Sequence, residues 1–455
     1  MLANLSKNCL RLRHSPVVPV RTFLSENYKL QEAWNTRLAS PIMEKINVET
    51  FHYELERKFN LQKIASPIDI DIYANKITDD NYFDEVGDLL VKLRKTAEAT
   101  NILDSTGHAY IRNLIDFDQF ESLIQVLDNR MDYGIFFDDF SANLAIDKLL
   151  KTGKFKEAAR LATIFMLQED FSNATTRALC LFACYKYLGN PEVFDDLKPP
   201  SEPEAEKGAK KKKVTEVKVR VAFLRNPYFD DHFDLKNSQH LVGKTFLLIG
   251  KELTKTGDTK LGTNIQLLGL GLYEKYTEAV KFLESTKGAE LEKDVIGKIN
   301  EALAKVGEEE QKNEAFQQFK NAIETIGSTH KVVESNFEEK LNDFCKNVVK
   351  ENEAKDMEQQ KKIYAAWNEI REKRLKEEIE RLQRTERLKH IEKLTTEMEA
   401  EERKLWFFEN EEQLNLDIES KRVFYPKRWF GKKKVPRKVD ENYIPPDVDK
   451  RRHAE

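Results

Sequence analysis

The chain has 455 residues, of which 34% are charged and 40% hydrophobic, and its formal net charge is −4. This length allows about two or three domains with sizeable buried cores. Gly (17 residues) and Pro (13 residues) are scarce, which argues against many short strands joined by tight turns and favours long helices. The four cysteines show no paired spacing, so we predict no disulfide framework and a reducing compartment.

The first 24 residues carry bases and no acid. Lys7, Arg11, Arg13 and Arg21 are interleaved with leucines, so the segment can form a basic amphipathic helix. This composition is typical of mitochondrial transit peptides, and we predict that residues 1–24 are a presequence for import into the mitochondrial matrix. A disordered basic terminus is the alternative. No apolar run approaches the ~20 residues that span a bilayer, so we expect no membrane insertion.

Helical hairpins are predicted over residues 68–197, after a lead-in segment at 25–67. Apolar residues recur at helical spacing in pairs of segments that begin near residues 68, 107 and 139. Starts roughly 30–40 residues apart are typical of stacked two-helix repeats. The predicted fold class is all-α: stacked helical hairpins, then further helices, a long charged helix and an extended basic tail.

Composition changes after the repeats. Residues 198–222 are rich in Pro and in charged side chains, which predicts a solvated linker. Alternation of apolar and charged residues predicts one strand within 214–224. Helical periodicity returns in a second helical region, 223–345, where we expect an antiparallel helix pair turned around Gly257 and Gly262.

One long, highly charged helix is predicted over residues 346–412. Its apolar stripe starts at Ile363, Trp367 and Ile370, and the seven-residue spacing is interrupted after Leu382. A long paired coiled coil is therefore less favoured than a single helix that packs on neighbours. Pairs of Glu with Lys or Arg four residues later help to keep such a helix folded.

Three motifs resemble chemical sites but lack required residues. Val242-Gly-Lys-Thr245 lacks the glycine of a phosphate-binding loop, because Ser238 stands there, and a helix start is favoured. Gly269-Leu-Gly271 lies in an apolar helical pattern and indicates close helix packing. His232 and His240 lie near acids without metal-ligand spacing, which favours a surface loop. We predict no catalytic residue, metal, cofactor or small-molecule substrate.

The strongest functional signal lies in the tail, residues 413–455. Its segment 421–438 holds nine bases, four aromatic residues and no acid. Lys and Arg neutralise phosphates, and aromatic rings stack on unpaired bases, which favours RNA binding over a plain solvated tail. The predicted RNA-binding residues are Lys421, Arg422, Lys427, Arg428, Trp429, Lys432, Lys433, Lys434, Arg437 and Lys438.

Residues 139–158 resemble a pentatricopeptide repeat, with Asn143, Asp147 and Gly153 among the residues at favoured positions. The stretch Tyr133–Leu144 is more specific. Together with the presequence and Pro227–Leu235, it resembles the pentatricopeptide-repeat subunit of the mitochondrial small ribosomal subunit, the small-subunit protein twenty-seven family.

This resemblance implies a structural, RNA-contacting component of the mitochondrial small ribosomal subunit that supports mitochondrial translation. Its implied partners are mitochondrial ribosomal RNA and neighbouring small-subunit ribosomal proteins. In pentatricopeptide repeats the position of Asn143 reads a base, so Asn143 is a further RNA-binding candidate; capping or local hydrogen bonding is the other interpretation. A free pentatricopeptide-type factor for mitochondrial RNA maturation or translation and a protein-only coiled-coil scaffold remain as alternatives.

Overall fold

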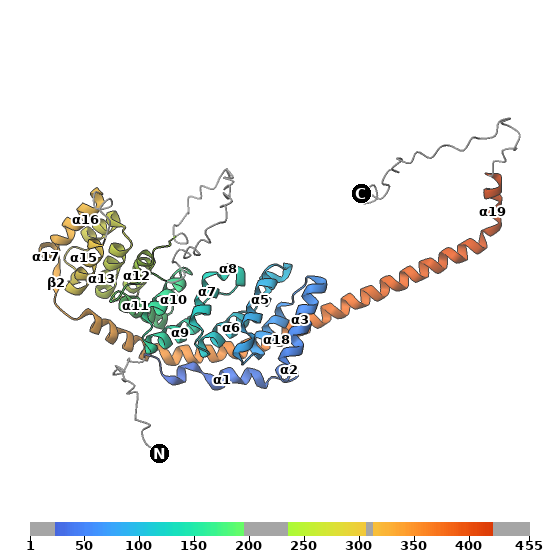
Figure 1. Cartoon of the computed structure of the whole chain (residues 1–455), viewed down its shortest axis with the longest axis horizontal. Helices are drawn as coiled ribbons and strands as arrows, with labels where there is room; N and C mark the ends of the chain where they lie inside the picture. Colours follow the sequence, from blue (N-terminus) through green and yellow to red (C-terminus); the bar gives the residue numbers. More distant parts are fainter. Residues whose placement is uncertain (1–22, 195–234, 306–312, 422–455) are drawn as a thin grey trace, which may run out of the picture. The chain divides into compact units, whose positions relative to one another are not determined.

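The computed structural model describes residues 23–194, 235–305 and 313–421 (Figure 1). The chain divides into two compact units, one ending at Leu375 and the other starting at Lys376. The described residues are almost entirely helical, which confirms the predicted all-α class. The expected linker at 198–222 and the strand predicted within 214–224 lie outside the described residues.

The lead-in segment, for which no helix was predicted, is itself helical. It contains two short turns of 3-10 helix at Glu26–Lys29 and Thr36–Ala39. Its α-helices are α1 (Gln31–Asn35), α2 (Pro41–Glu44) and α3 (Val48–Gln62). Asn47 caps the longest of them, α3, because its side chain accepts a hydrogen bond from the Glu49 amide at 3.0 Å.

Residues 67–187 form two layers of helices. The first layer contains α4 (Pro67–Lys76), α6 (Asp104–Asp116), α9 (Asp139–Thr152) and α11 (Ala174–Tyr187), which contact one another in that order. The second layer contains α5 (Phe83–Arg94), α7 (Phe120–Asp128) and α10 (Phe155–Met166); the short α8 (Arg130–Tyr133) and 3-10 turns at Asp80–Tyr82 and Ala97–Asn101 lie in the connections. First-layer helices start 35 to 37 residues apart, which confirms the predicted stacked hairpins.

Local residues set the ends of these helices. Asp138 caps α9 by accepting from the Ser141 amide at 3.1 Å. The same helix ends at Gly153, whose φ of 76° lies in the left-handed region that glycine adopts without strain. Asn173 caps α11 in the way that Asp138 caps α9.

A second group of helices continues the stack. Helix α12 (Ser238–Thr256) packs on α10 and α11 and thereby fills the place of a second-layer helix beside α11. The elements that follow are α13 (Thr259–Leu272), α14 (Tyr276–Ser285), β1 (Glu290–Glu292), α15 (Lys293–Ala304), α16 (Glu314–Glu324), α17 (Ile326–Thr329) and β2 (Lys331–Val333). The strands pair in parallel. They were not predicted, since three residues are too few to show an alternating pattern.

Helices α12 and α13 approach each other closely through glycines. A Cβ atom on Gly269 would lie 2.6 Å from the Leu247 amide nitrogen, and one on Gly243 would lie 2.6 Å from the Tyr273 amide nitrogen. The interpretation of Gly269 as a packing residue and of residues 242–245 as helix is therefore confirmed. Only Gly257, with φ of 111°, lies at the turn; Gly262, also expected there, packs inside α13 against Thr254.

The last helices differ from expectation at both ends. Helix α18 (Phe337–Glu409) starts before the predicted residue 346, because its apolar first turns and its charged continuation contain no Gly or Pro. Helix α19 (Glu411–Ser420) occupies the first part of the segment that was expected to be extended. Glu411 and Glu412 lie in its first turn, where negative charge favours helix formation.

The glycine contact makes a testable prediction. Gly269→Ala should lower the free energy of unfolding by roughly 1–3 kcal/mol, because the added methyl overpacks the α12–α13 contact. Gly297→Ala is the matched control: it lies in α15 with no atom within 4 Å of its Cβ, and it should raise stability by about 0.5–1 kcal/mol. Thermal and chemical unfolding of the two variants would measure both effects. Equal effects of the two substitutions would contradict the close-packing account.

Candidate nucleic-acid interface

The side of the first helix layer that carries Asn143 is covered by two other segments of the same chain. One is residues 23–39, and the other is the part of α18 that belongs to the first unit, 337–375. Figure 1 shows this part of α18 passing along α9 and α6, with α1 on its other side. We call this covered side the inner face.

The first turns of α18 contact α11, where the Phe337 ring packs on Tyr185 and Glu338 pairs with Lys186. The buried Cys345 thiol lies 3.2 Å from the Ala178 carbonyl oxygen, to which it donates. About three turns further on, the Asp356 carboxylate accepts a hydrogen bond from the Thr175 hydroxyl at 2.7 Å. These contacts fix α18 along α11, from the C-terminal end of that helix to its N-terminal end.

Tyr364 of α18 lies opposite α6. Its hydroxyl oxygen accepts from Arg112 Nη1 at 2.8 Å and lies 3.0 Å from His108 Nε2. The Trp34 ring packs against Tyr364 and Arg112. Its centroid is 5.3 Å from that of the Tyr364 ring and 5.0 Å from the Arg112 guanidinium carbon. Burial raises the pKa of Tyr364 to about 12, so the phenol remains neutral at physiological pH. The N-terminal segment, α6 and α18 thus meet in one buried cluster.

Arg371 of α18 forms a buried ion pair with Asp71 of α4. Arg371 Nε donates to Asp71 Oδ2 at 2.6 Å, and the two side chains are 3% and 0% exposed. The other carboxylate oxygen accepts from the Thr106 hydroxyl at 2.9 Å, from the Asn75 amide at 3.0 Å and from the Ser105 hydroxyl. Because the carboxylate is fully hydrogen-bonded, the desolvation of the pair is compensated.

Sequence reasoning missed these residues. It assigned the packed stripe of α18 to apolar side chains, yet Ile370 is 42% exposed while Tyr364 and Arg371 are buried. The prediction that Ile370 belongs to the packed stripe is therefore wrong. A usable signal was the seven-residue spacing between Tyr364 and Arg371, which places both on the face that also carries the half-buried Trp367.

Residues 23–28 complete the cover of α9. The Phe23 and Leu24 amides donate to Asp147 Oδ1 at 3.2 and 3.3 Å, and both side chains are buried. The Tyr28 ring stacks on Phe140 with 4.8 Å between centroids. A chain processed to begin at Phe23 would keep the Asp147 contacts, whereas removal of the whole predicted presequence, 1–24, would abolish them. Residues 1–22 lie outside the described residues.

Asn143 itself is fully buried. Its amide nitrogen donates to the Tyr28 hydroxyl oxygen at 3.0 Å, so its partner comes from the lead-in segment of the same chain. A base could contact this amide only after Tyr28 had moved away. The hydrogen bond fits the other interpretation, in which Asn143 bonds within the protein, and the base-reading role stays a prediction.

Only one predicted residue of the tail is described. Lys421 follows the last turn of α19 and is exposed. The other nine lie outside the described residues: Arg422, Lys427, Arg428, Trp429, Lys432, Lys433, Lys434, Arg437 and Lys438. Asn143 belongs to the first unit and Lys421 to the second.

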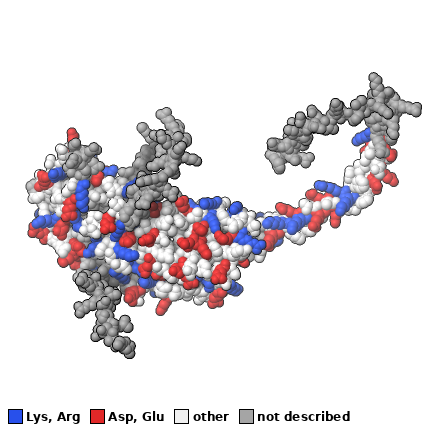
Figure 2. Space-filling model, viewed as in Figure 1, with Lys and Arg blue, Asp and Glu red and all other residues white. Residues whose placement is uncertain are grey.

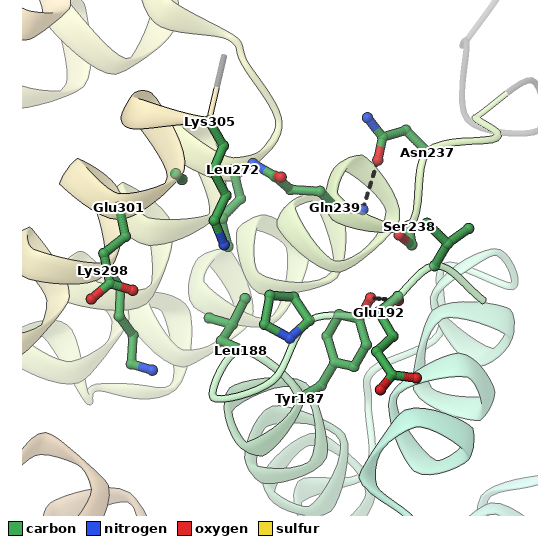
Figure 3. Close-up of a pocket in the computed structure, with 13 residues that line it drawn as sticks. Tyr187, Leu188, Glu192, Asn237, Ser238, Gln239, Leu272, Lys298, Glu301 and Lys305 are labelled. Atoms are coloured by element: carbon green, nitrogen blue, oxygen red, sulfur yellow. Dashed lines mark hydrogen bonds between the residues drawn. The ribbon is translucent and has the colours of Figure 1, made fainter. Parts of the chain in front are cut away.

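A cavity of about 220 Å³ lies where the end of α11 meets α12 and α15 (Figure 3). Its lining mixes charges of both signs, with Lys298 and Lys305 beside Glu301 and Glu192. Burial lowers the pKa of Lys298, whose ammonium lies 4.5 Å from the centroid of the Tyr185 ring. Such a lining does not select an anion, and we assign it no ligand.

The histidines and acids singled out in the sequence do not gather in the described residues. His240 pairs with Glu274 at 3.2 Å, while His232 and its neighbouring aspartates lie outside the described part of the chain. Over the ranges that the structure describes, no set of three or more His, Cys, Asp or Glu side chains could hold a metal ion. No described helix is long and apolar enough to cross a membrane.

Comparison with known families decides the identity. The family described as mitochondrial 28S ribosomal protein S27 matches residues 1–397. The chain belongs to this family. It is therefore a mitochondrial protein and a component of the small ribosomal subunit. The match includes the whole helix stack and α18 up to residue 397, so the covered inner face lies entirely within it.

The buried ion pair gives a testable prediction for this family member. Arg371→Met should lower the free energy of unfolding by about 3–5 kcal/mol, because the buried Asp71 carboxyl group would lose its ion-pair partner. Chemical denaturation would measure the loss, and hydrogen exchange should rise in residues 357–375. The control is Lys373→Met, a nearby exposed position of the same helix, which should change neither quantity appreciably. Similar losses in both variants would refute the anchoring role of Arg371.

Proposed function

We propose that this ribosomal protein is a structural, RNA-contacting component of the mitochondrial small ribosomal subunit in the matrix, where it supports translation. The helix stack would present fixed outer surfaces to neighbouring small-subunit proteins and ribosomal RNA. The tail from Lys421 to Lys438 would add phosphate contacts, since Lys and Arg dominate it. The observation that carries the structural role is the inner face, which the chain covers with its own α18 and N-terminal segment.

A free pentatricopeptide-type factor is less well supported. Repeats that read RNA one base at a time need open side chains on the first helices of several hairpins. Here Asp71, Arg112 and Asn143, one from each of three successive first-layer helices, are buried against other parts of the chain. A protein built in this way is suited to hold a position within an assembly.

Sedimentation tests the proposal directly. The full-length chain should move with the small ribosomal subunit through a sucrose gradient at moderate salt, and ultraviolet light should crosslink it to ribosomal RNA. Ribonuclease treatment should release part of the protein. If it sediments only in light fractions, the proposed function is wrong. If it stays bound after ribonuclease treatment and gives no RNA crosslink, the protein-only scaffold is the better description.

The tail makes a separate prediction. Replacing Lys432, Lys433, Lys434, Arg437 and Lys438 by Gln should weaken RNA association and flatten its salt dependence. For every phosphate that is no longer neutralised, the slope of log affinity against log salt should become shallower by about 0.7–0.9.

The matched control removes the same charge elsewhere. Five exposed lysines of α18 are replaced by Gln: Lys355, Lys361, Lys362, Lys373 and Lys376. This variant should keep the slope of the wild type, measured by filter binding to the small-subunit RNA. An unchanged slope in the tail variant would show that the tail does not bind phosphates.

A further inference from the structure

The end of α18 carries large apolar side chains that the described chain leaves uncovered. Leu405, Trp406, Phe407 and Phe408 are each between 48% and 69% exposed, and Leu416 and Ile418 of α19 are 66% and 62% exposed. The Phe407 and Phe408 rings contact only at an edge, with 5.9 Å between centroids. We call these six residues the apolar end cluster. A group of this size is typical of an interaction site, whereas single exposed apolar residues are ordinary.

The geometry of the cluster restricts the shape of its partner. Successive residues of an α-helix are rotated by about 100°, so four consecutive residues point in all directions around the axis. Leu405 to Phe408 therefore cannot all rest on a flat surface. A groove or pocket that encloses the helix on more than one side would bury them.

The charge around the cluster restricts the chemistry of the partner. Between residues 397 and 420 the sequence has nine acids and two bases, Arg403 and Lys404. In Figure 2 the side chains at the end of the described chain are mainly white and red. RNA phosphates would be repelled by this segment, and a second copy of the chain would bring the same negative charge. A basic protein surface is complementary.

We propose that residues 397–420 dock in an apolar groove with a basic rim on a neighbouring protein of the small ribosomal subunit. The inference rests on the proposed function, because RNA-contacting proteins of the same subunit supply basic surfaces. Trp and Phe side chains would fill the groove and contribute most of the affinity, while the acids would guide association and register. The family match ends at residue 397, so the docking segment lies almost entirely outside the matched region.

Photocrosslinking within the assembled subunit tests the proposal. The full-length chain carries p-benzoylphenylalanine in place of Phe408, and small subunits that contain it are isolated and irradiated. The expected product joins this chain to a ribosomal protein, at an apolar segment flanked by Lys and Arg. The same probe at the exposed Glu386, in the mixed-charge part of α18, should give little of it. Adducts with RNA, adducts with a second copy, or yields no higher than at Glu386 would overturn the proposal.

Two sets of variants, with the probe at Leu416, separate the apolar and charged contributions. Trp406→Ala/Phe407→Ala/Phe408→Ala and Glu409→Lys/Glu411→Lys/Glu412→Lys should each lower the protein crosslink about tenfold or more. The control Glu380→Lys/Glu386→Lys/Glu392→Lys changes the charge equally and should leave the yield unchanged. Unaltered circular dichroism would show that each variant is folded. An equal loss in the control would overturn the proposal.

The outcome also separates this inference from the proposed function. A wild-type chain that fails to sediment with the small subunit contradicts the proposed function itself. A chain that sediments with the subunit and crosslinks from position 408 only to RNA, or to nothing, contradicts the docking site alone.

Discussion

The packing of α18 against the first helix layer is the constraint on which the first unit depends. Polar side chains on α4, α6 and α9, namely Asp71, Arg112 and Asn143, are buried, and buried polar groups are costly without partners. Their partners come from α18 and from the N-terminal segment, at separations of up to 300 residues along the chain. Repeat proteins usually gain stability from neighbouring repeats alone. Here a helix from outside the repeats contributes to all of them.

This arrangement changes what a pentatricopeptide-like array offers to other molecules. The inner face, where the first helices of RNA-reading repeats display their side chains, is a packed interior in this protein. Contacts with the rest of the ribosome must then use the outer surfaces and the ends of the chain. The order of charge near the C-terminus is informative: an acidic helical segment up to Ser420 is followed at once by a basic one. The acidic segment favours a basic protein surface, and the basic segment favours RNA phosphates.

Part of this structure could be predicted from local sequence. The hairpin starts, the packing role of Gly269 and the single long helix all follow from patterns within about 20 residues, such as apolar periodicity and glycine placement. The cover of the inner face could not be predicted in this way. From local sequence, an Arg in a highly charged helix is predicted to be solvated. Burial of Arg371 is favourable only because of Asp71, which lies far away in the sequence. The partner of Asn143 could not be predicted for the same reason, since Tyr28 lies in a segment without a repeat pattern.

The spacing of the α18 contacts has a consequence for how such a protein can change in length. Tyr364 contacts α6, and Arg371, seven residues later, contacts the adjacent helix α4. Seven residues of α-helix advance about 10 Å, close to the ~8–10 Å between the axes of packed helices. Two turns of α18 therefore span the step between these two neighbouring helices. Deletion of a single residue between the two positions would shift and rotate every later side chain out of register. Over evolution, a change in the length of this part of α18 would need a matching change in the spacing of α4 and α6.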